Sequence, residues 1–172
     1  MTAAAEVREA IPADLAVVMC HRRRMFEDMG HRDPAALDAM ERVSGPVIRR
    51  GLESGLYRGW LAQAPDGEVV AGGGVLLVSF PCQPRDPSPR RAWILNVYTE
   101  PRYRRQGLAR RLMEVAIAWC RKQGLGSVYL HASEDGRPLY EALGFTPTNE
   151  MQLDLRAAPG AGGRGTTNPE DQ

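Results

Sequence analysis

The order of apolar and polar residues along the chain predicts both strands and helices. Stretches rich in β-branched and aromatic residues predict strands at residues 6–10, 57–64, 68–80, 91–99, 126–133 and 151–156. Apolar residues at helical spacing predict helices at residues 14–29, 33–43, 107–123 and 137–145. Ser44, Gly45 and Pro46 are expected to interrupt the second helix before residues 47–54.

Turn residues indicate how these elements connect. Pro65-Asp66-Gly67 is a tight-turn sequence, so the strands on either side of it should form an antiparallel hairpin. Glycines 72–74 lie inside the second of those strands and indicate a bulge or a close backbone approach. The strand–helix–strand unit from 91 to 132 should be parallel with a right-handed crossover. The pattern therefore predicts an α/β (α+β) fold in which helices cover a mixed sheet.

Length and composition indicate one domain. The chain has 172 residues, which suits a single domain with a sizeable core, and we place that domain at residues 1–156. Residues 157–172 contain no apolar residue larger than alanine or proline, so we expect a disordered tail there.

Charge and cysteine content narrow the cellular setting. The 22 basic and 21 acidic residues give a net charge of +1, which argues against nucleic acid or a membrane as partner. No apolar run reaches the roughly 18 residues that a membrane span needs. Three separated cysteines suit reduced thiols, and the N-terminus lacks a signal-peptide pattern, so we expect a cytoplasmic protein.

Positive charge is nevertheless concentrated between the strand at 91–99 and the helix at 107–123. A helix that begins near Gly107 leaves its first N–H groups without partners, and the helix dipole adds to their attraction for an anion. Gly107 allows close backbone approach, and Arg104, Arg105 and Arg110 add charge suited to phosphate. A diphosphate would fit this segment; a solvated basic helix start is the alternative interpretation.

Two motifs in this part of the chain resemble those of a known family. Residues 104–109, RRQGLA, fit the signature [QR]-x-x-G-x-[GA], and residues 139–145, LYEALGF, fit a second signature. Their order and spacing resemble the GCN5-related N-acetyltransferase (GNAT) superfamily, over roughly residues 6–156. The resemblance implies a mostly antiparallel sheet of six to seven strands, with a splayed parallel central pair and about four flanking helices.

The resemblance also implies an activity. It suggests direct acetyl transfer from acetyl-CoA, as co-substrate and without a metal, to a primary amine of a small molecule or a protein N-terminus. The main chain of Val97, Tyr98 and Thr99 would bind the pantetheine. The pyrophosphate would lie on Arg104, Arg105, Gln106, Gly107, Leu108, Ala109 and Arg110. Ser133 stands where relatives often have a cofactor-binding asparagine, seven residues before Tyr140.

The catalytic groups are less fully defined by the resemblance. Tyr140 matches the family's proton donor to the departing thiolate. The glutamate that many relatives use as a base is absent from both central strands. Histidine as a residue type can accept a proton near neutral pH, so His131 is then the favoured base, with Asn96 orienting a water or the acetyl carbonyl. Glu27 and Asp28 are the alternative bases.

The acceptor and the partners stay open. Acidic residues in the first two helices would attract a cationic amine, whereas residues 21–24 would attract a carboxylate. We expect acetyl-CoA and an amine as partners, with a homodimer as an open possibility. Two other classes remain as alternatives: a catalytically silent acyl-CoA-binding module and a nucleic-acid-binding domain.

Overall fold

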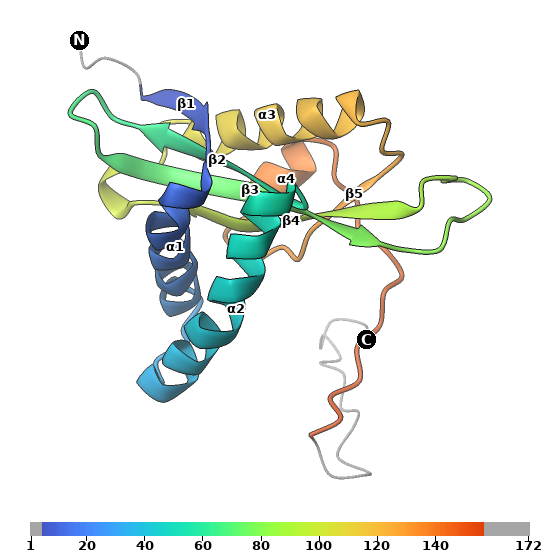
Figure 1. The fold of residues 1–172 in the computed structure, drawn as a ribbon, viewed down its shortest axis with the longest axis horizontal. Helices are drawn as coiled ribbons and strands as arrows, with labels where there is room; N and C mark the ends of the chain where they lie inside the picture. The colour runs from blue at the N-terminus through green and yellow to red at the C-terminus, as the bar shows by residue number, and fades with distance from the viewer. Residues whose placement is uncertain (1–4, 157–172) are drawn as a thin grey trace, which may run out of the picture.

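The computed structural model describes residues 5–156 (Figure 1). Its strands are β1 (Glu6–Glu9), β2 (Tyr57–Gln63), β3 (Val69–Ser79), β4 (Arg90–Thr99) and β5 (Val128–Tyr129). Its α-helices are α1 (Leu15–Asp28), α2 (Pro34–Ser54), α3 (Leu108–Lys122) and α4 (Arg137–Ala142). Short 3₁₀ turns at Pro12–Asp14 and Pro101–Tyr103 precede α1 and the loop before α3.

The strands form one mixed sheet in the order β1-β2-β3-β4-β5. The first four pair antiparallel, whereas β4 and β5 are parallel and are joined through α3. Helices α1 and α2 lie on one side of the sheet, and α3 and α4 lie on the other (Figure 1). The predicted mixed α/β fold with a parallel pair and four flanking helices is confirmed.

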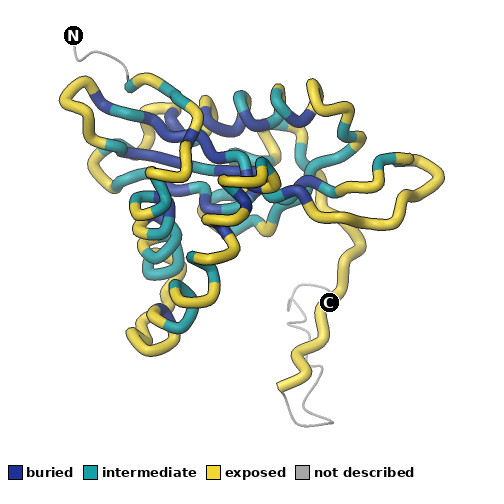
Figure 2. The backbone as a smooth tube through the Cα atoms, viewed as in Figure 1, coloured by how far each residue is buried: buried dark blue, intermediate teal, exposed yellow. Residues whose placement is uncertain are grey.

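Each face of the sheet has its own apolar core. The larger core packs α3 through Leu108, Leu112 and Met113 against the sheet, and Tyr140 and Leu143 of the α4 region join its margin. The smaller core packs α1 and α2 against Tyr57 and Leu61 of β2. Burial is accordingly concentrated in the sheet and the inner helix faces (Figure 2). The sheet is thus held rigidly from both sides.

One of the three glycines of β3, Gly74, is explained by the close approach of Tyr57. A Cβ atom on Gly74 would overlap the ring and hydroxyl of Tyr57. The Tyr57 hydroxyl instead passes over Gly74 and accepts a hydrogen bond of 3.0 Å from the Asn96 side chain on β4. The β3–β4 register shifts between Gly72 and Gly74, so the predicted bulge is present.

The strand count differs from the expected six to seven. The described residues contain five strands: β5 is shorter than the predicted 126–133, and residues 151–156 form no strand. Asn96 has a left-handed backbone, with φ of 59°, and the bulge there turns β4 away from its neighbour after two paired residues. Residues 151–156 pair with no strand among the described residues, and a lone extended segment does not persist as a strand.

The expected interruption of the second helix is also wrong. Helix α2 runs unbroken through Pro46 to Ser54. Proline removes one hydrogen bond to the carbonyl four residues earlier, here that of Arg42. Both residues are exposed, so water can solvate that carbonyl and the break is avoided.

Two expectations concern the ends of the chain and its surroundings. The tail predicted at residues 157–172 lies outside the described residues, so its order is not tested. Among the described helices, none combines the length and the apolar character that crossing a membrane would require.

Candidate active site

The loop before α3 presents a row of backbone donors. Arg105 and Gly107 have positive φ values of 63° and 79°, and α3 begins directly afterwards at Leu108. The N–H groups of residues 105–110 donate to no acceptor among residues 5–156, and the first helical bond in this segment is Arg111 N–H to Gly107 O. Leu108 is buried and anchors the helix start. Free N–H groups at a helix start, together with the helix dipole, attract anions.

The arginines of this loop have different partners. Arg104 Nε donates to the Thr99 carbonyl at 2.9 Å, and its guanidinium pairs with Asp28 of α1. Arg110 lies 3.7 Å from Glu114. Arg105 is exposed and forms no ion pair within residues 5–156, and Gln106 donates to the Arg102 carbonyl. Arg104 thus fixes the loop to α1, while Arg105 adds uncompensated charge beside the free N–H groups.

Strands β4 and β5 separate before β4 reaches this loop. They pair only at Ala92–Val128 and Trp93–Tyr129. From Ile94 to Thr99 the edge of β4 that faces away from β3 has no strand beside it in the described residues. Val97 and Thr99 belong to this segment, as does Tyr98, whose ring packs 5.1 Å from that of His21. The predicted pantetheine-binding residues therefore border the opening between β4 and β5.

Tyr140 and Ser133 are brought together at the start of α4. The Ser133 hydroxyl accepts a hydrogen bond of 3.2 Å from the Gly136 N–H. A Cβ on Gly136 would lie 2.9 Å from the Tyr140 ring and 3.1 Å from Ser133 Oγ, so only glycine fits between them. Tyr140 is half-buried against Phe145, and burial raises the pKa of its hydroxyl. The phenol is therefore neutral near pH 7 and can donate a proton.

His131 lies outside the strand in which it was expected. It is exposed, follows β5 by two residues, and its ring centroid is 5.1 Å from that of Trp93. Ala92 and Ile94 pack in the larger core, on the sheet face covered by α3. Because side chains alternate along a strand, Trp93 points to the opposite face, which α1 and α2 cover. His131 packs against Trp93 and therefore lies on that face too. Asn96 lies on the same face, but no hydrogen bond joins it to His131 within the described residues.

Asn96 is buried in a polar network. Its Oδ1 accepts a hydrogen bond of 2.7 Å from Arg22 Nη1, and its Nδ2 donates to the Tyr57 hydroxyl. Burial raises the pKa of Tyr57 to about 12. Because both ends of the Asn96 amide are engaged, its first role in this structure is to hold the bulge of β4.

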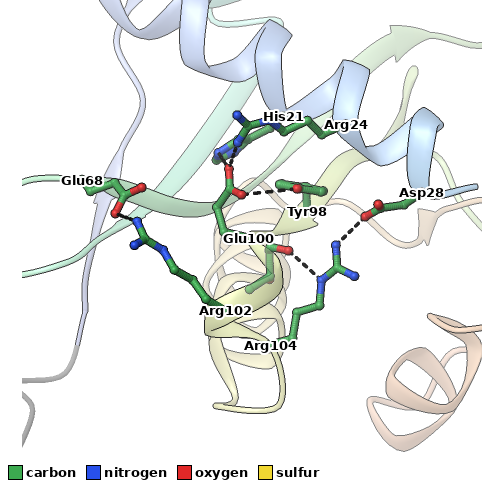
Figure 3. Close-up of polar contacts among 9 residues, drawn as sticks. His21, Arg24, Asp28, Glu68, Tyr98, Glu100, Arg102 and Arg104 are labelled. Atoms are coloured by element: carbon green, nitrogen blue, oxygen red, sulfur yellow. Dashed lines mark hydrogen bonds and ion pairs between the residues drawn. The ribbon is translucent and has the colours of Figure 1, made fainter.

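Glu100 lies in this region although no sequence pattern predicted it there. This residue follows β4 directly and contacts three side chains from α1 and β4 (Figure 3). Its carboxylate pairs with Arg24, lies 3.8 Å from His21 Nε2 and accepts from the Tyr98 hydroxyl at 3.5 Å. Burial lowers the pKa of His21, and the opposing attraction of Glu100 is smaller. Extending the predicted strand by one residue would have included this carboxylate.

The alternative bases are both held by arginines. Glu27 pairs with Arg23 at 3.2 Å, and Asp28 pairs with Arg104 (Figure 3).

Among residues 5–156, no group of three or more His, Cys, Asp or Glu side chains is placed to hold a metal ion.

Comparisons with known proteins agree on one family. The model of the acetyltransferase (GNAT) family matches residues 26–145. A glucosamine 6-phosphate N-acetyltransferase of Trypanosoma brucei brucei is 30% identical over 134 residues, which cover 76% of this chain and 86% of that protein.

Solved structures give the same result. A GCN5-related N-acetyltransferase from Ralstonia eutropha JMP134 has a TM-score of 0.82 and 35% identity, and covers 88% of this chain and 99% of its own. A predicted acetyltransferase from Clostridium acetobutylicum, solved with acetyl-CoA, has a TM-score of 0.81 at 24% identity and covers 88% and 96%. The family match spans the loop at 105–110 and the segment around Tyr140. The chain belongs to the GNAT family and is an acetyl-CoA-dependent N-acetyltransferase.

Proposed function

We propose that the protein transfers an acetyl group from acetyl-CoA directly to the primary amine of a small molecule. The observation that carries this proposal is the run of six N–H groups at residues 105–110 that have no acceptor within residues 5–156, next to the opening between β4 and β5. The acceptor named for the 30% identical relative is an amino sugar phosphate, which favours a small amine over a protein N-terminus.

The cofactor would lie across this opening. Its pyrophosphate would accept from the N–H groups of residues 105–110, with Arg105 and Arg110 adding charge. Its pantetheine would run along the free edge of β4 at Val97, Tyr98 and Thr99 and complete the hydrogen bonds that β5 does not reach.

The reaction needs two proton transfers. A neutral amine attacks the thioester carbonyl, the new N–C bond forms, and the C–S bond breaks. His131, directly or through a water, would accept the amine proton, and Tyr140 would donate a proton to the departing thiolate. Ser133 would act by starting the helix that positions Tyr140. Asn96 would keep the β4 bulge in place beside the reacting carbonyl.

The experiment is an amine panel assayed for CoA thiol release. The panel contains glucosamine 6-phosphate, amino acids, polyamines, aminoglycosides and peptides with free N-termini, with a control that lacks amine. Release with a small amine supports the proposal, and release only with peptides would move the acceptor to protein N-termini. Acetyl-CoA binding without release from any amine would favour the alternative, a catalytically silent acyl-CoA-binding module.

We also propose that two copies associate through the segment at 151–155. Met151, Leu153 and Leu155 are 98%, 77% and 86% exposed and alternate with polar residues, which is the pattern of a strand with one apolar face. This segment leaves the body of the fold (Figures 1 and 2), while the outer edge of β5 has no neighbouring strand in the described residues. Each copy thus offers both an unpaired segment with a strand-like apolar pattern and a free sheet edge, which a two-fold dimer would pair.

A cytoplasmic location belongs to the proposal as well. The three cysteines are free, and two of them are exposed, which suits a reducing compartment.

A further inference from the structure

Arg22 differs from its neighbours on α1 in having no acidic partner in the part of the chain that the structure describes. Arg23 pairs with Glu27, Asp38 and Glu41, and Arg24 pairs with Glu100. The guanidinium of Arg22 has no carboxylate within 4.0 Å among residues 5–156, although the side chain is half-buried. A buried charge without a counter-ion is costly, commonly several kcal/mol.

The donors of Arg22 are only partly used. Nη1 donates to Asn96 Oδ1 at 2.7 Å, and Nε is buried without an acceptor in the described residues. Nη2 donates to no described acceptor either, and it is not among the buried atoms, so it stays accessible. The groups that interact with this guanidinium include the neutral Asn96 amide, the neutral Tyr57 phenol and the Phe26 ring, 5.0 Å away. None of them balances the positive charge.

The position of Arg22 indicates that an anion bound there would belong to the acceptor amine and not to the cofactor. Arg22 contacts Asn96 at the bulge where β4 leaves β5, on the sheet face that also carries Trp93 and His131. The N–H groups proposed to hold the pyrophosphate belong to the start of α3, which packs against the opposite face. An anion at Arg22 would therefore lie on the same sheet face as the proposed base, away from the proposed pyrophosphate site.

We propose that Arg22 binds the anionic group, a carboxylate or a phosphate, of the acceptor amine. The inference rests on the proposed function, since it presupposes that an amine reaches the β4 bulge from the α1 side. Arginine suits this task because it stays protonated and makes charge-assisted hydrogen bonds to either oxyanion. The acceptor class is then a small amine that also carries an anion.

The test compares matched amines that differ by one anion. The pairs are glucosamine 6-phosphate against glucosamine, and L-alanine against L-alaninamide, assayed by CoA thiol release with the wild type and three variants. Arg22→Met removes the charge at similar length, Arg22→Lys keeps it, and Arg23→Met is a matched control on the same helix. The quantity measured is the ratio of kcat/KM for the anionic member to that for the neutral member.

The wild type should favour the anionic member of at least one pair by about tenfold or more, the scale of one charge-assisted hydrogen bond. Arg22→Met should reduce that ratio by about tenfold, mainly through KM, while Arg22→Lys and Arg23→Met should keep most of it. The pair that responds identifies the anion as phosphate or carboxylate.

Three outcomes would overturn the inference. The first is a wild-type enzyme that prefers the anionic amine in neither pair. The second is an Arg22→Met enzyme that loses activity equally toward the anionic and the neutral amine, so that the ratio of their kcat/KM values is unchanged. The second outcome would assign Arg22 to support of the bulge. Absence of thiol release with every amine would overturn the proposed function and this inference with it. That outcome differs from the first two, in which the enzyme is active.

Discussion

At the scale of single residues, Tyr140 has the most specific predicted role. Tyr140→Phe removes the hydroxyl but keeps the ring that packs against Phe145. We expect the variant to fold and to bind acetyl-CoA, while kcat falls by roughly one to four orders of magnitude, as is usual when a general acid is lost. Steady-state thiol release together with a melting curve measures both properties.

Tyr129→Phe is a suitable control for Tyr140→Phe, because Tyr129 loses only a hydrogen bond from Ser127 of 3.3 Å. A Tyr140→Phe enzyme with the full rate of the wild type would mean that water or another group protonates the thiolate.

His131→Gln tests the proposed base. We expect kcat at pH 7 to fall by roughly 10²-fold or more, because most of the amine is protonated there and must lose a proton. The deficit should shrink as the pH rises, since more of the amine is then already neutral. The pH–rate profile of the variant is compared with that of the wild type, with Glu27→Gln and Asp28→Asn measured in parallel. An unaltered profile for His131→Gln would leave the residue a packing partner of Trp93.

The residues of the site differ in how far the sequence could predict them. Gly107 and Tyr140 belong to local sequence motifs. In the structure Gly107 directly precedes α3, and Tyr140 is half-buried. The Arg22–Asn96–Tyr57 network joins three elements separated by up to 74 residues in the chain. No local sequence pattern predicts such a network, because it depends on the bulge in β4 and on the space that the missing side chain of Gly74 leaves for Tyr57.

At the scale of elements, the hairpin of β2 and β3 and the helix α3 matched their predicted ranges closely. Their signals were local: turn residues for the hairpin, and apolar spacing with a terminal glycine for the helix. Pro46 misled the prediction for α2, which stays helical at an exposed position where water can reach the freed carbonyl of Arg42. The short β5 and the unpaired residues 151–156 depend on pairing partners, which a linear pattern does not contain.

Gly74→Ala tests the packing that joins β2, β3 and β4. The new methyl would overlap the Tyr57 ring and displace the hydroxyl from Asn96. Overpacking of this kind typically costs about 1–3 kcal/mol of unfolding free energy, which urea denaturation measures.

Gly45→Ala is the matched control for Gly74→Ala. Nothing lies within 4 Å of a Cβ at Gly45, and in the middle of α2 alanine should stabilise by up to about 1 kcal/mol. If Gly74→Ala is as stable as the wild type, the Tyr57–Gly74 contact does not constrain the sheet.

At the scale of the whole molecule, the unpaired apolar segment predicts self-association. Leu153→Glu places a charge in the middle of the apolar face of residues 151–155 and should turn a dimer into a monomer, which light scattering coupled to size exclusion measures. Asp154→Asn, on the polar face, should leave the dimer intact. A wild type that is monomeric at high micromolar concentration, or a Leu153→Glu variant that stays dimeric, would contradict the proposed association.

The central claim is that acetyl-CoA binds with its pyrophosphate on the loop at 105–110. A valine at Gly107 places bulk on the backbone that a diphosphate must approach, and also strains a residue with φ of 79°. Gly124→Val is the matched control: its φ is 70°, its Cβ would also meet nothing within 4 Å, and it lies beyond the other end of α3.

Calorimetric titration of acetyl-CoA into the wild type and these two variants tests that claim most directly. We predict that Gly107→Val weakens the affinity by at least about tenfold, near 1.4 kcal/mol, while Gly124→Val binds like the wild type. Unchanged affinity in Gly107→Val, or an equal loss in both variants, would contradict the assignment of this loop to the cofactor.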